Sequence, residues 1–155
     1  MKTIYAIIFA VSIISASDAK PIQDFVTVKL GAKAFRDGDV IRIDEVRSTS
    51  PKLEQGDTVT VNGHYRLESR DAASLQLLLT QIKGNGLEES DKKQILNITR
   101  GRFQPFEVTI TLKHKGYLHL TFYDTKTGKP FGGTYFGTVE QMDKSSGLSV
   151  SHYLK

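Results

Sequence analysis

The chain of 155 residues contains no cysteine. It therefore forms no disulfide bond and no thiolate zinc site, and it has neither a cysteine nucleophile nor an N-terminal cysteine for lipid attachment. Small secreted domains of eukaryotes usually depend on disulfides, so a cysteine-free chain favours a bacterial exporter. Asn97-Ile98-Thr99 is a glycosylation sequon, which matters only in a eukaryotic host.

Charged residues of one sign do not form a large cluster anywhere in the sequence. The formal net charge is +4, and lysine and arginine are scattered along the chain. The densest clusters are Arg100 with Arg102 and Lys113 with Lys115, and each is too small for a nucleic-acid footprint. We therefore expect these side chains to lie on solvated faces, and we expect no nucleic-acid partner.

Long apolar runs are also lacking, with one exception at residues 4–14. This run follows a short positive start at Lys2 and precedes a set of small residues. Ser17 and Ala19 fit the −3 and −1 positions of a secretory signal. The alternative is a membrane anchor, but a spanning helix needs about 20 apolar residues. The pattern therefore predicts a cleaved signal.

This interpretation divides the chain into three parts. Residues 1–19 are a signal peptide, residues 20–24 a short tether, and residues 25–155 a single domain large enough to bury a core. No second apolar run approaches spanning length, so we expect no membrane span after cleavage. The expected localisation is secreted or periplasmic.

The C-terminal half alternates between apolar and polar residues with a period of two. The runs cover residues 106–112, 117–123 and 131–139, and they are separated by polar segments that contain glycine, aspartate or proline. This pattern is typical of half-buried antiparallel strands. On this interpretation the strand faces that carry Val108, Ile110, Leu118 and Leu120 are buried.

Further strands are expected at residues 25–30, 40–46, 58–67 and 94–99, with a turn at Asp37-Gly38. Asn62-Gly63 lies in the middle of one run and allows either a type I′ hairpin turn or a bulge. A hairpin there would have arms of only four residues. We therefore favour one bulged strand.

Residues 72–83 fit two patterns. Leu75, Leu78, Leu79 and Ile82 would share a helical face, whereas Leu75, Leu77 and Leu79 would share a strand face. Every neighbouring element is a strand, so we predict a strand here as well. For the tail we predict a serine-rich loop and a short edge strand at residues 148–153.

Together these patterns predict an all-β antiparallel β-sandwich of seven to nine strands. The segment 41–48, Pro51 and the Gly-Asp-Thr-Val-Thr-Val run at 56–61 resemble an immunoglobulin-like bacterial domain. In that group a strand, a proline-bearing loop and a Gly-Asp-x-Val-x-Val strand open the sandwich. The resemblance implies an immunoglobulin-like sandwich only, because the chain lacks the paired cysteines and core tryptophan of antibody-type domains. It transfers no active site.

The chemistry-bearing residues form no recognisable catalytic or metal motif. The four histidines are His64, His114, His119 and His152, and none has metal-ligand spacing. The acidic segment around Asp37 would need oxygen ligands where Ile41 and Ile43 stand, which argues against calcium. No serine lies in a Gly-x-Ser-x-Gly motif. We therefore expect no metal and no cofactor.

Aromatic residues gather in the C-terminal strands, and strand parity sorts them by face. Leu118, Leu120 and Phe122 share one face, which we expect to be core, while Thr121 shares the other face with its alternate neighbours. On the next strand Phe136 is the expected core residue. The candidate binding residues are Tyr117, His119, Tyr123 and Tyr135. The alternative is that a loop or the edge of the other sheet covers this second face.

Exposed aromatic side chains on a sheet can stack on sugar rings or anchor a protein partner. We therefore expect an exported, non-catalytic binding or structural module, with a polysaccharide or another envelope protein as its partner. The alternative is a small secreted hydrolase whose carboxylate or histidine the sequence does not locate. A cleft with convergent polar groups would favour the hydrolase, and an exposed aromatic strip would favour binding.

The signal-peptide interpretation predicts that the exported protein begins at Lys20, since small residues precede it at the expected cleavage positions. The measurement is the intact mass of the protein recovered after export. A mass that still includes residues 1–19 would contradict cleavage.

Overall fold

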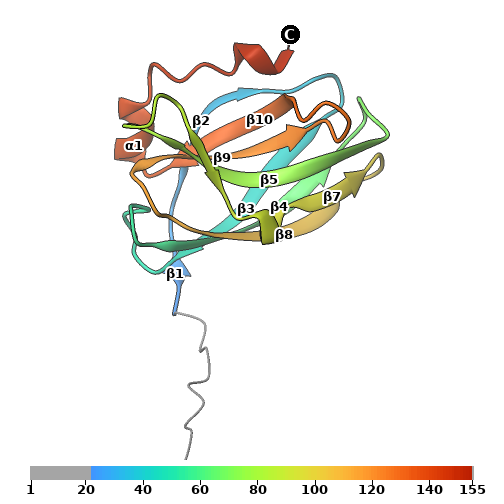
Figure 1. The fold of residues 1–155 in the computed structure, drawn as a ribbon. Helices are drawn as coiled ribbons and strands as arrows, with labels where there is room; N and C mark the ends of the chain where they lie inside the picture. Colours follow the sequence, from blue (N-terminus) through green and yellow to red (C-terminus); the bar gives the residue numbers. More distant parts are fainter. Residues whose placement is uncertain (1–21, 155) are drawn as a thin grey trace, which may run out of the picture.

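Two antiparallel sheets stack face to face in the computed structural model, which describes residues 22–154 (Figure 1). Sheet 1 has the order β1 (Asp24–Phe25), β3 (Val40–Ser48), β4 (Thr58–Arg66) and β8 (Gln104–Thr111). Sheet 2 has the order β2 (Lys29–Ala34), β10 (Pro130–Gly137), β9 (Gly116–Tyr123), β5 (Ala72–Gln81) and β6 (Glu88–Ser90), and β7 (Leu96–Thr99) also pairs with β5. The predicted all-β sandwich is confirmed. The predicted signal peptide and its cleavage site lie outside the described residues.

The strand predicted at residues 25–30 is wrong, because the chain changes sheets within it. Asp24 and Phe25 pair with β3 in sheet 1, whereas β2 begins only at Lys29 and pairs with β10 in sheet 2. After Phe25 the Val26 amide still donates a hydrogen bond of 2.8 Å to the Val46 carbonyl of sheet 1. This crossing adds a short strand, so the described residues contain ten strands rather than seven to nine.

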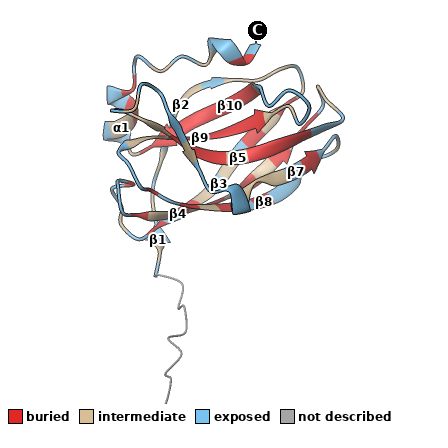
Figure 2. Cartoon of the chain, viewed as in Figure 1, coloured by how far each residue is buried: buried red, intermediate tan, exposed pale blue. Residues whose placement is uncertain are grey.

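The core lies between the sheets and is built from alternating side chains. Figure 2 shows β5, β9 and β10 as mostly buried, and their inward faces meet those of sheet 1. The predicted burial is confirmed for Val108, Ile110, Leu118 and Leu120. Burying a side chain of this size contributes about 1.5–3 kcal/mol relative to leaving it exposed.

Strand β4 is continuous, as favoured by the sequence, but the irregularity lies in its neighbour β3. Ile43 pairs with Gly63 and Glu45 pairs with Asn62, so Asp44 is an extra residue without a partner in the ladder. A Cβ on Gly63 would lie 2.1 Å from the Arg42 carbonyl oxygen, so only glycine allows this close approach. Beyond Asp44, the bulge therefore inverts the alternation of β3 side chains between the core and the outer face.

Residues 72–81 form strand β5, which confirms the strand interpretation over the helical one. It pairs along its length with β9, from Ser74 opposite Tyr123 to Gln81 opposite Gly116. The alternating leucines face the core, and Ile82, which a helix would have buried, is exposed. Non-local pairing with β9 therefore decides between two patterns that the local sequence left open.

The predicted edge strand at residues 148–153 is wrong. The chain leaves β10 at Gly137, forms the helix α1 (Val139–Lys144) and ends in the 3₁₀ turn η2 (Ser151–Leu154). Thr138 and Gln141 form a capping box, which fixes the start of α1. The tail then crosses β10 and β2 as a third layer (Figure 1). No helix within residues 22–154 is long and apolar enough to cross a membrane.

The core arrangement predicts that Ile110→Ala lowers the free energy of unfolding by about 2–5 kcal/mol, because it opens a cavity between well-packed sheets. The measurement is the denaturant midpoint of the variant and its parent. Thr111→Ala, at the exposed neighbouring position, is the control and should change the midpoint much less. Equal midpoints for Ile110→Ala and the parent would mean that the face is not buried.

Candidate functional site

The four predicted binding residues lie on the outer face of sheet 2, and three of them gather closely. His119 of β9 pairs with Tyr135 of β10, and their rings are 4.7 Å apart. The Tyr135 hydroxyl lies 3.1 Å from the Thr80 hydroxyl of β5. The Tyr123 hydroxyl and His119 Nε2 both contact the Glu88 carboxylate of β6, whereas Tyr117 lies opposite Thr80 in the strand pairing.

The exposure expected for two of these residues is wrong. His119 is 0% exposed and Tyr135 is 5% exposed, while Tyr117 and Tyr123 are half-buried. The cause is the tail, which lays Tyr153 of η2 against the sheet with only 1% of its surface exposed. The covering loop that the sequence left as an alternative is therefore present. The role of these residues in binding stays a prediction.

Gly133 of β10 makes room for this covering side chain. A Cβ at Gly133 would lie 2.6 Å from the Leu120 carbonyl oxygen and 3.1 Å from the ring of Tyr153. Any larger residue would therefore push the strands or the tail apart.

A chain of polar contacts lies beneath Tyr153. The His119 Nδ1 atom is 2.7 Å from the Thr121 hydroxyl, which is in turn 3.1 Å from the Tyr153 hydroxyl. The Tyr123 hydroxyl donates a hydrogen bond of 2.7 Å to Glu88 Oε2. Burial raises the pKa of both tyrosines, and the Glu88 carboxylate adds to this rise. Both phenols are therefore neutral hydrogen-bonding groups at ordinary pH.

His119 is buried as a neutral imidazole. Burial lowers its pKa to about 3, and the nearby His152 adds a smaller repulsion. Its Nε2 atom lies 3.5 Å from Glu88 Oε1 but has no hydrogen-bond partner among the described residues. The contact with Glu88 is thus no ion pair at neutral pH.

This cluster contains the side-chain types of a hydrolase but not the access that one needs. A histidine beside a hydroxyl and a carboxylate can in principle activate a nucleophile. Here the imidazole and the Thr121 hydroxyl are both fully buried, and Tyr153 covers them. A substrate cannot reach these atoms while the tail is in place, so the cluster joins the tail to sheet 2.

The outer face of sheet 1, in contrast, is open. The strand register sets its outward side chains in rows, with Phe25 beside Arg47, then Thr60, then Thr109. The next row holds Glu45, Asn62 and Glu107. Apart from Phe25, all side chains of these two rows are polar or charged. A shallow hollow of about 390 Å³ lies over these two rows.

Two exposed phenylalanines stand at opposite corners of this face. Phe25 is 71% exposed and Phe103 is 46% exposed. The Arg47 guanidinium lies 4.8 Å from the Phe25 ring centre, and that of Arg66 lies 5.1 Å from the Phe103 ring centre. Cation–π contacts of this kind hold an exposed ring in place.

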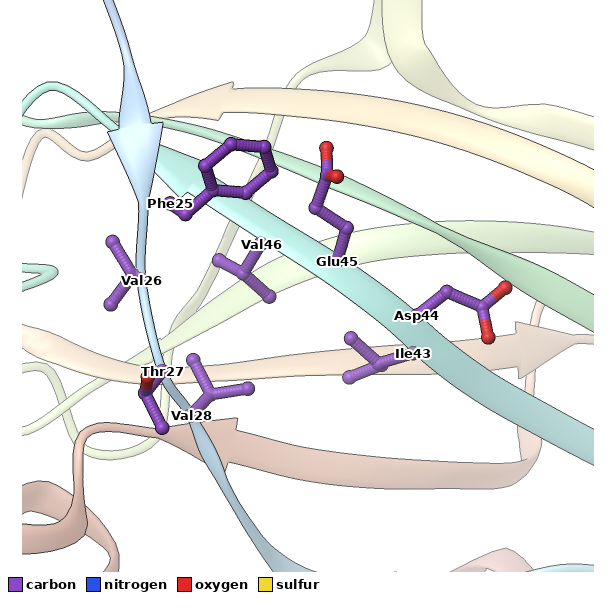
Figure 3. Close-up of a pocket in the computed structure, with 8 residues that line it drawn as sticks. All are labelled: Phe25, Val26, Thr27, Val28, Ile43, Asp44, Glu45 and Val46. Atoms are coloured by element: carbon purple, nitrogen blue, oxygen red, sulfur yellow. The ribbon is translucent and has the colours of Figure 1, made fainter.

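Phe25 also borders the gap where the chain crosses between the sheets. Figure 3 shows this pocket of about 370 Å³, with the Phe25 ring beside Glu45 and the side chains of Val28 and Ile43 facing each other. Both of those aliphatic residues pack against the core, but the Phe25 ring does not. The ring is therefore available at the surface.

Three arginines of the sheet 1 face are paired with carboxylates, while Glu107 is exposed and forms no ion pair among the described residues. Arg47 contacts Glu45 at 2.5 Å, Arg42 contacts Asp44 at 2.8 Å, and Arg66 contacts Glu68 at 3.1 Å. The hydrogen bond from His64 and the nearby Arg42 lower the pKa of Asp44, which keeps this carboxylate ionised. The face therefore carries many polar groups but little net charge.

Sequence reasoning missed this face for two local reasons. Phe25 lies in a run that reads as an ordinary strand, and Phe103 lies beyond Gly101, in a segment read only as a strand break. The signal that could have found Phe103 is an aromatic residue placed directly after Arg102 in a polar connection, because connecting segments lie at the surface.

The burial of neutral His119 predicts a pH dependence of stability. The ordinary pKa of 6.5 applies to the unfolded chain, so the folded state binds a proton less readily. The stability is fully present above pH 6.5 and falls as the pH decreases toward about 3. His119→Gln should therefore lose less stability than the parent between pH 7.5 and 4.5, measured by denaturant unfolding.

Thr121→Val is the matched control for this measurement. It removes the hydroxyl partner of the imidazole but leaves the titrating group buried, so it should lower stability at both pH values and keep the slope of the parent. A parent and a His119→Gln variant with the same slope would contradict the assignment.

Comparisons with known proteins do not assign the chain to a family. No family model matches it, and neither the curated proteins nor the solved structures give a significant match. The function must therefore be inferred from the two outer faces of the sandwich, of which one is covered by the tail and the other is open.

Proposed function

We propose that the protein is an exported, non-catalytic binding module that contacts its partner through the outer face of sheet 1. The observation that carries this proposal is the pair of exposed phenylalanines at opposite corners of an open sheet face, each held by an arginine. Covering a large exposed aromatic side chain with a partner contributes favourable free energy. An interaction surface accounts for both rings.

The covered state of the other face supports the same choice. Of the four predicted binding residues, only Tyr117 and Tyr123 are more than slightly exposed, and Tyr123 is already bonded to Glu88. The rings of His119 and Tyr135 have no access to a partner in this structure. Sheet 1 is therefore the better binding surface.

The strand order supports an immunoglobulin-like arrangement of the sandwich. In such domains one sheet contains the order A-B-E and the other the order G-F-C. The orders β3-β4-β8 and β10-β9-β5 follow the same scheme, with the connections from β4 to β5 and from β8 to β9 crossing between sheets. Domains of this kind commonly serve as binding modules, and the apolar run at residues 4–14 supports export.

The proposal predicts that Phe25→Ala combined with Phe103→Ala weakens binding by at least about tenfold, since each ring contributes on the order of 1 kcal/mol. The measurement is co-sedimentation of the exported protein with polysaccharides and with envelope protein fractions. The melting temperature should stay unchanged, because neither ring belongs to the core.

Two control variants show which sheet face is responsible for binding. Ile82→Ala with Leu87→Ala removes the same kind of exposed apolar surface beside sheet 2 and should leave binding intact. Tyr117→Ala tests the outer face of sheet 2. Binding that survives the double phenylalanine variant but is lost with Tyr117→Ala would overturn the choice of sheet 1.

A further inference from the structure

The two exposed rings are too far apart for one small ligand. Phe25 belongs to the row of Thr60 on β4, and Phe103 contacts Arg66 on the same strand. Six residues of strand separate these rows, or about 20 Å at roughly 3.3 Å per residue. The rings also lie on opposite sides of β3 and β4. A ligand that contacts both must therefore be an extended polymer.

The side chains between the rings suit a hydroxylated polymer. The Thr60 and Thr109 hydroxyls lie 2.9 Å apart and bond each other, and the Asn62 amide lies 3.4 Å from Glu45. Glu107 presents an exposed carboxylate on the edge strand β8. A carboxylate accepts two hydrogen bonds from neighbouring hydroxyls, while an amide both donates and accepts. Gln94 adds a second amide, whose oxygen accepts from the Thr109 backbone amide at 3.2 Å.

The paired arginines argue against an anionic polymer. Arg42, Arg47 and Arg66 each already contact a carboxylate two residues away in the sequence. Nucleic acids and acidic polysaccharides need unpaired cations that release counterions on binding. Glu107, on the edge strand β8, would repel a polyanion. The charges of the face thus favour a neutral ligand over an anionic one.

The distribution of apolar surface argues against a protein partner. Protein interfaces have a central core that is depleted in charged residues and rich in contiguous apolar contacts. Here the row between the two rings carries Glu45, Asn62 and Glu107, and the two rings stand alone at the corners. Isolated flat rings suit the C–H faces of sugar rings, which carry partial positive charge and meet the negative face of the aromatic ring.

We propose that the outer face of sheet 1 binds a neutral polysaccharide, whose chain runs diagonally from Phe25 to Phe103. Each ring stacks on one sugar unit, and Asn62 and Glu107 bind the hydroxyls of the units between them. The arginines hold the rings before the ligand arrives, which lowers the entropy cost of binding. This inference rests on the proposed function, because it names the partner of the same face.

The test uses the exported protein and affinity electrophoresis in gels that contain a single polysaccharide. The neutral probes are xylan, galactomannan, starch and a mixed-linkage glucan, and the anionic probes are alginate and polygalacturonate. We expect retardation by at least one neutral probe, with affinity unchanged between 50 and 500 mM salt because no counterions are released.

The variants then assign the site. Phe25→Ala and Phe103→Ala should each weaken binding to the retarding probe by roughly fivefold, and Glu107→Gln should weaken it by a smaller factor. Ile82→Ala with Leu87→Ala should bind as the parent does. Oligosaccharides too short to reach both rings should bind weakly and respond to only one of the two phenylalanine variants.

The possible outcomes distinguish the polysaccharide inference from the proposal that sheet 1 is the binding face. If no neutral probe retards the protein, or if salt abolishes binding to an anionic probe, the polysaccharide inference is overturned. If the phenylalanine variants instead abolish binding to an envelope protein, sheet 1 remains the binding face and only the ligand class is wrong. If neutral binding is equal in the parent and in both phenylalanine variants, both proposals fail.

Discussion

The pairing of β9 with β5 and β10 is the interaction on which the rest of the structure depends. It joins the C-terminal hairpin to the middle of the chain, and it places Leu118, Leu120 and Phe122 in the core. Because strand side chains alternate, the same pairing forces His119 and Thr121 onto the opposite face. The core of the sandwich thus leaves polar groups outside it, and the molecule must either solvate or cover them.

The C-terminal tail covers these polar groups and forms specific hydrogen bonds with them. A neutral imidazole needs a hydrogen-bonding partner when it leaves water, and the adjacent Thr121 hydroxyl supplies one. Tyr153 then brings its own hydroxyl to Thr121 while its ring fills the space above Gly133. One ordered tail residue therefore bonds to Thr121 and buries the imidazole, which makes the outer face of sheet 2 a second, smaller core.

The sequence predicted the elements that depend on local alternation and missed those that depend on a third layer. The faces of Val108, Ile110, Leu118 and Leu120 follow from a period of two, and the structure confirms them. The same period cannot say whether an outward face meets water, because nothing in the alternation of β9 encodes the position of η2. The crossing after Phe25 and the bulge at Asp44 escaped for a related reason, since both are set by neighbouring strands rather than by their own residues.

The bulge also links the fold to the proposed binding face. With an extra residue at Asp44, Ile41 and Val46 both face the core although an odd number of positions separates them. Arg42 and Arg47 consequently both face outward, and each can lie against a phenylalanine at its own corner. Without the bulge, one of these arginines would point into the sandwich, where an unpaired cation is prohibitively costly. The outward direction of both arginines is therefore a consequence of one inserted residue, whose close approach Gly63 permits.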